Sequence, residues 1–130
     1  MKKLISLTLV LVFLLSGCVT KQQTAKSYND KVHPYVLRFA DAVALASSTS
    51  RGALSGPVQE LQKIKRETDA LSIPECAVLV HQLFLDAMDS TISGFLSYMS
   101  NDDESIVAAY IAAATQSLKE YNVAREYICE

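Results

Sequence analysis

Residues 76–129, CAVLVHQLFLDAMDSTISGFLSYMSNDDESIVAAYIAAATQSLKEYNVAREYIC, decide the fold of this chain. Apolar residues recur at three- and four-residue spacing on both sides of the polar turn at 100–104. That periodicity predicts two amphipathic helices, over about 74–99 and 103–128. Because the turn between them is short, the two helices should run antiparallel as a hairpin.

The cysteines at the two ends of this hairpin are Cys76 and Cys129. They are equidistant from a turn centred near residue 102, so the antiparallel pairing brings their thiols side by side, as a disulfide requires. Cross-linking a loop of this size stabilises a fold by about 4 kcal/mol. The alternative is a pair of buried free thiols.

Two further helices are predicted upstream of the hairpin. The first spans about 28–48 with Pro34 near its first turn, and the second spans about 57–71 after a loop rich in Ser, Thr and Gly. Short connections between four helices predict an all-α, up-down-up-down four-helix bundle. Their apolar stripes comprise Val32, Tyr35, Val36, Phe39, Val43 and Ala46 in the first helix and Val58, Leu61, Ile64, Thr68 and Leu71 in the second.

The N-terminus carries the features of an export signal. Two lysines precede an apolar run from Leu4 to Leu15, which is too short for a permanent membrane span of about 20 residues. The run ends in Leu15-Ser16-Gly17-Cys18, and this tetrapeptide resembles the lipobox of bacterial lipoprotein precursors. The rest of the chain resembles no family known to us.

The lipobox resemblance implies cleavage between Gly17 and Cys18 and acylation of the Cys18 sulfur. The protein would then be anchored by lipid in the cell membrane or the outer membrane, facing the periplasm or the cell exterior. The expected organisation is a signal peptide over 1–17, a lipidated cysteine with a polar tether over 18–27, and a helical domain over 28–130. An ordinary secretory signal that happens to end in Gly-Cys is the alternative.

Composition and charge exclude several classes of protein. The chain of 130 residues is 50% hydrophobic and 20% charged, which excludes intrinsic disorder and leaves room for one domain. Beyond the export signal, ten basic residues stand against 14 acidic ones, a formal net charge of −4. A nucleic-acid partner is therefore not expected, because binding to phosphates needs a basic face.

No catalytic or metal-binding pattern is present. His33 and His81 are the only histidines, and neither belongs to a ligand motif, so His81 is predicted to be a partly buried structural residue. The acidic run at 102–104 lacks the alternating ligands of a calcium loop. We expect no catalytic residue, no metal, no cofactor and no small-molecule substrate.

One region could contact a partner. The second helix is short, and it should cover the third helix only up to about Ser90. Either the first helix and the loop carrying Ala53 and Leu54 cover the apolar residues beyond that point, or these residues form a tip that binds another envelope protein. The candidate tip residues are Phe95, Tyr98, Met99 and Tyr110.

These observations favour a lipid-anchored, non-enzymatic envelope protein that acts by protein–protein contact or as a structural part of the envelope. One alternative is an immunity or superinfection-exclusion lipoprotein. A second is a periplasmic four-helix protein that binds a metal or haem, which the missing ligand motifs disfavour.

Overall fold

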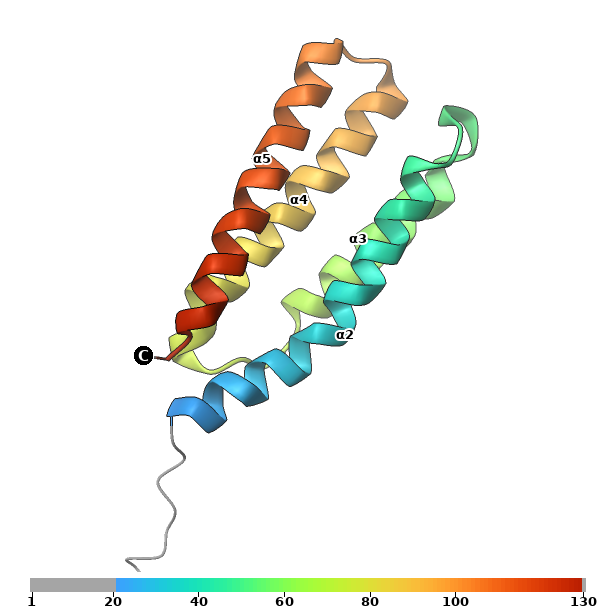
Figure 1. Cartoon of the computed structure of the whole chain (residues 1–130). Coiled ribbons are helices and arrows are strands. Elements are labelled where there is room, and N and C mark those ends of the chain that lie inside the picture. The colour runs from blue at the N-terminus through green and yellow to red at the C-terminus, as the bar shows by residue number, and fades with distance from the viewer. Residues whose placement is uncertain (1–20, 130) are drawn as a thin grey trace, which may run out of the picture.

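Four helices pack together in the computed structural model, which describes residues 21–129 (Figure 1). Successive helices run in opposite directions, so that two antiparallel hairpins lie side by side. Residues 1–20, on which the expected signal peptide, the lipobox-like sequence with Cys18 and the first expected tether residues fall, lie outside the described part. Within 21–129, none of the helices has the length and apolar character needed to span a membrane. The helices are α2 (Lys21–Ser47), α3 (Ser55–Asp69), α4 (Val78–Ser100) and α5 (Glu104–Ala124), with short 3-10 turns η1 (Arg51–Ala53), η2 (Glu75–Ala77) and η3 (Arg125–Tyr127).

Helix α2 begins at Lys21, whereas the sequence predicted a tether to residue 27 and a helix from residue 28. The expected tether is wrong over 21–27, where Lys, Gln and Ala favour helix and extend it without an apolar stripe. Pro34 therefore lies inside the helix. The ribbon bends where its colour passes from blue to cyan (Figure 1), as an internal proline causes. The bend lets the first half of α2 cover the bundle end, where Tyr28 and Val32 are fully buried.

The first hairpin joins α2 to α3, and the predicted stripe of α3 forms its inner face. Val58, Leu61, Ile64 and Thr68 are all buried, which confirms that prediction. The hydroxyl of Thr68 donates to the Ile64 carbonyl at 2.8 Å. This local hydrogen bond satisfies the hydroxyl and leaves the methyl group to pack in the core.

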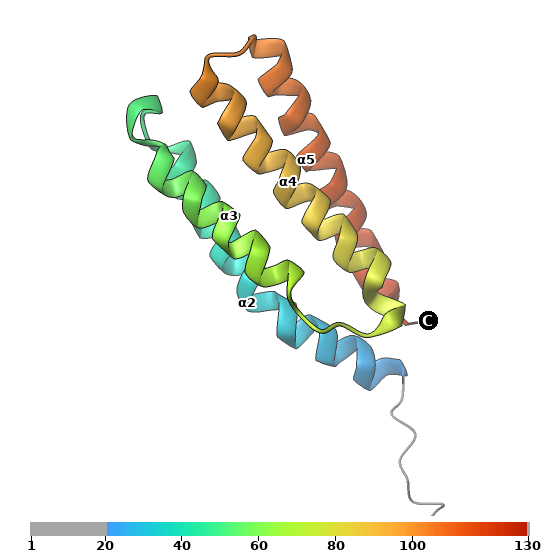
Figure 2. The ribbon, with the colours of Figure 1, turned by 180° about the vertical axis from the view of Figure 1, so that it is seen from behind.

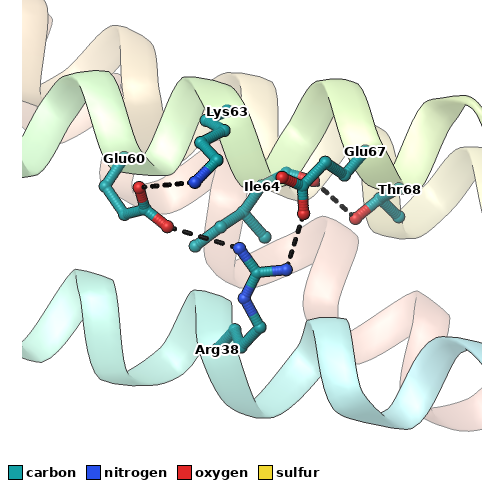
Figure 3. Close-up of polar contacts among 6 residues, drawn as sticks. All are labelled: Arg38, Glu60, Lys63, Ile64, Glu67 and Thr68. Carbon is teal, nitrogen blue, oxygen red and sulfur yellow. Dashed lines mark hydrogen bonds and ion pairs between the residues drawn. The ribbon is translucent and has the colours of Figure 1, made fainter.

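An ion-pair network fastens α2 to α3 on the outside of this hairpin (Figure 3). The Arg38 guanidinium donates to Glu67 at 2.6 Å and to Glu60 at 3.3 Å, and Lys63 lies 3.6 Å from Glu60. The hydrogen bond from Arg38 lowers the pKa of the Glu67 carboxyl below its ordinary value. All these groups are exposed, so the network fixes the helix register more than it stabilises the fold.

The second hairpin, α4 and α5, turns where the sequence predicted. Asn101 ends α4 in the left-handed conformation, with φ 60°. Asp103 begins α5 by accepting a hydrogen bond from the Ser105 backbone N–H at 2.8 Å. At the other end of the hairpin, η2 and the residues after η3 meet.

Cys76 and Cys129 form the predicted disulfide there, with their Cα atoms 5.0 Å apart. This separation lies in the normal range for a disulfide. We call this part of the molecule, where α2 begins, α4 begins and α5 ends, the disulfide end (Figures 1 and 2).

Replacing Cys76 and Cys129 together by Ser should lower the free energy of unfolding by up to about 4 kcal/mol, because the bridge closes a loop of 53 residues. Chemical denaturation of the wild type with and without reductant, beside the double variant, measures the loss. Equal midpoints in all three samples would show that the bridge does not form.

Candidate functional site

Helix α3 covers more of α4 than the sequence predicted. The ammonium of Lys65 lies 2.7 Å from the Asp89 carboxylate, so residues of α3 and α4 whose numbers average 77 lie opposite each other. The predicted pairing of the start of the second helix with Ser90 gives an average near 73. The difference arises because that prediction took no account of the extended segment before η2. The N-terminus of α3 therefore reaches the C-terminal half of α4, and Ile92 in that half is buried. The expectation that α3 leaves α4 uncovered beyond Ser90 is wrong.

The open side of the bundle lies instead between α2 and α5, which share one side of the molecule (Figure 1). There the two hairpins enclose a cavity of about 450 Å³, a volume within the range of about 300–1,000 Å³ of ligand pockets. We call it the groove. Its lining comprises Val43, Ala46, Ser47, Thr49 and Leu54 from α2 and the following loop, Thr91, Gly94, Phe95 and Tyr98 from α4, and Val107, Ile111, Ala114, Thr115 and Leu118 from α5.

Side-chain size explains why the groove is confined to one half of the molecule. Nearer the disulfide end, Phe84 of α4 lies against Phe39 of α2 and Tyr121 of α5, with ring centroids 6.3 and 5.1 Å apart. These three rings fill the space between the hairpins. Beyond them, Ala46 and Ala114 face the same space, and the rings of Phe95 and Tyr98 line it without filling it.

The groove is uncharged, because none of its lining residues carries a charge. Its threonines turn their hydroxyls away: Thr49, Thr91 and Thr115 each donate to the carbonyl four residues earlier, at 2.7–2.8 Å. With the hydroxyls satisfied by their own helices, the threonines add methyl groups to the walls. The groove thus suits apolar side chains or other apolar groups.

Arg51 lies beside the lining residue Tyr98, at the edge of the groove that we call its mouth. The Arg51 guanidinium lies 4.3 Å from the centre of the Tyr98 ring and donates to the Asn101 side-chain oxygen. Among the described residues, Arg51 has no acidic partner within ion-pair distance. An incoming group that carries a carboxylate would find an available positive charge there.

The four candidate tip residues separate into two groups. Phe95 and Tyr98 line the groove. Met99 packs against the core, while Tyr110 lies outside the groove with its Cβ near the backbone of Gly94. Tyr98 and Tyr110 are 40% and 37% exposed, and binding of a partner by these four residues stays a prediction.

Sequence reasoning missed two exposed groove residues, Ile111 and Leu118, which are 60% and 38% exposed. On α5, Ala114 and Tyr121 are buried, whereas Ile106 is exposed. The spacing Val107, Ile111, Ala114, Leu118 was the available signal, because it alternates four- and three-residue steps.

The histidines do not form a metal site in the described part of the chain. His33 lines a separate, polar hollow of about 430 Å³ with Asp30 and Arg125. His81 is buried against the edge of Tyr28, with ring centroids 6.0 Å apart. No group of three His, Cys, Asp or Glu side chains among residues 21–129 could hold a metal ion.

Comparison with known proteins adds no relative: no family model, no curated protein and no solved structure matches this chain.

Burial makes His81 sensitive to pH. Desolvation lowers its pKa, and the Thr68 backbone and the Asp69 carboxylate offset only part of this. The unfolded chain then binds a proton more readily than the folded one, so stability falls as pH drops below about 6.5. Replacing His81 by Phe should flatten the melting temperature between about pH 7.5 and 5.

Thermal melts of wild type and H81F at both pH values measure this effect. The pKa values of Glu67 and Asp103 are lowered as well. Because carboxylates ordinarily titrate near pH 4, these two groups change the stability only below pH 5. Parallel pH profiles for the two proteins would contradict the assignment.

Proposed function

We propose that this protein is a lipid-anchored, non-enzymatic protein of the bacterial envelope, and that it binds an amphipathic helix of another envelope protein in the groove between α2 and α5. The observation that carries the binding role is the groove itself, an uncharged cavity of about 450 Å³ that stays open between two hairpins.

The three cysteines support the anchored location. Cys76 and Cys129 are joined, and such a bridge persists in an oxidising compartment outside the cytosol. Cys18 is the remaining cysteine and stands at the end of the lipobox-like sequence. One acylated cysteine and one disulfide account for all three thiols of an exported protein.

The spacing of the groove residues supports a helical partner. Val43 and Ala46 on α2 face the groove together with Val107, Ile111 and Leu118 on α5. One three-residue step on α2, and steps of four, three and four residues on α5 through Ala114, form the seam that a further helix fills with its own apolar ridge. The two hairpins meet chiefly through α3 and α4, so α2 and α5 can both contact the incoming helix.

The positive charge of Arg51 suggests that one end of the partner helix carries a negative charge. Arg51 at the mouth has a neutral partner in Asn101 and a ring partner in Tyr98. An acidic residue at the matching end of the incoming helix would gain a charge-assisted hydrogen bond there. The proposed partner is therefore an amphipathic helix with apolar residues at three- and four-residue spacing and a carboxylate at one end.

The anchor is tested by growing cells that express the full chain with labelled palmitate. Label should enter the wild type and be lost in Cys18→Ala, whereas Cys76→Ala with Cys129→Ala should keep it. Mass spectrometry of the mature protein should find Cys18 at its N-terminus. Label retained in C18A, or a mature chain that begins elsewhere, would contradict the anchor.

The groove is tested by a photo-crosslinking amino acid at Thr115, inside the groove, and at Leu37, which is 53% exposed outside it. In intact cells, position 115 should capture a partner and position 37 should not. Adding Ile111→Ser should abolish the product at 115, because this exposed side chain contributes contact but little stability, about 0.5 kcal/mol.

The captured segment must then be mapped by peptide mass spectrometry. An amphipathic helical segment supports the proposal. Capture at both positions, an unchanged product with I111S, or a captured segment without an apolar stripe would contradict it.

A further inference from the structure

We propose that the disulfide end of the domain rests on the lipid bilayer and inserts apolar side chains into its surface. This inference depends on the proposed lipid anchor at Cys18. It adds a second contact with the membrane, made by folded parts of the chain that are distant from Cys18 in sequence.

The length of chain before α2 requires the domain to sit close to the membrane. Helix α2 begins at Lys21, three residues after Cys18. Three extended residues span at most about 10 Å. The start of α2 lies beside the start of α4 and the end of α5 in both views (Figures 1 and 2). Acyl chains on Cys18 therefore bring this whole end to the bilayer surface.

The same end exposes large apolar side chains that no part of the described chain covers. Leu79, in the first turn of α4, is 71% exposed, more than any other large apolar residue of the described chain. Seven such residues are more than half exposed, and four of these lie in the first turn of α4, the last turn of α5 or η3. They are Val78, Leu79, Val123 and Tyr127.

Their chemistry suits the interface between water and lipid. A tyrosine ring is favourable at the headgroup level, with its hydroxyl in water and its ring toward the acyl chains. The described charges at this end nearly cancel, since Lys21, Lys26 and Arg125 are offset by the exposed Glu75 and Glu126. The contact should therefore form on a neutral phosphatidylcholine surface and should not need anionic lipid.

This orientation has a consequence for the groove. The groove lies beyond the Phe84 rings, in the half of the bundle remote from the disulfide end. A domain that stands on its disulfide end presents the mouth of the groove, at Arg51 and Tyr98, away from the membrane. A partner anchored elsewhere in the envelope could then reach it.

The test uses tryptophan as a depth probe, because the chain contains no Trp. Leu79→Trp reports on the disulfide end, and Leu45→Trp, at a 59% exposed position near the far end of α2, is the matched control. The full lipidated protein carrying each variant is reconstituted into vesicles of phosphatidylcholine, with or without bromine on the acyl chains. Flotation of the vesicles first establishes whether the protein is anchored.

The brominated lipid should reduce the fluorescence of L79W by roughly half and leave L45W nearly unchanged, since inserted residues reach the boundary of the acyl chains. Anchored protein without quenching at 79 would overturn this inference and leave the anchor intact. Equal quenching at both positions would contradict the orientation. A change in the fluorescence of L79W that requires high protein density and occurs without brominated lipid would indicate contact with a second copy of this chain instead of with lipid. Failure to float would overturn both proposals.

Discussion

The packing of Phe84 between Phe39 and Tyr121 is the contact on which the shape of this protein depends. Three helices meet at this level, because Phe39 of α2 and Tyr121 of α5 both pack against Phe84 of α4. Toward the disulfide end, the fully buried Tyr28 and the Cys76–Cys129 bridge close the structure. Away from it, Ala46 and Ala114 face the space between the hairpins, and Phe95 and Tyr98 line that space without filling it. Because interiors pack closely, a space that side chains do not fill remains as an open groove.

The two ends of the bundle thus differ in chemistry. The disulfide end combines the start of α2 with exposed Leu79 and Tyr127, while the opposite half holds an uncharged groove with Arg51 at its mouth. In the proposed account, one end meets the membrane and the other meets a protein. A rigid, disulfide-closed hairpin would hold these two surfaces at a fixed distance.

Sequence periodicity predicted the four helices, their order and the disulfide, because each depends on local spacing and on symmetry about one turn. It failed where the information is not local. The polar residues 21–27 are helical because they extend α2 in the N-terminal direction from Pro34. The spacing of apolar residues cannot reveal this extension, because the segment carries no apolar stripe. The groove depends on which side of α5 faces α2. Alanines surround the stripe of Ile111 and Leu118 on α5, so the apolar pattern alone fitted more than one rotation of the helix.

The openness of the groove is the central claim, and paramagnetic broadening of side-chain methyl signals by a water-soluble agent measures it most directly. The methyl groups of Ile111 should broaden as strongly as those of Leu37, because these residues are similarly exposed, while the fully buried Met88 methyl should stay sharp. Protection of Ile111 to the level of Met88 would show that α2 and α5 close on each other and that no groove exists.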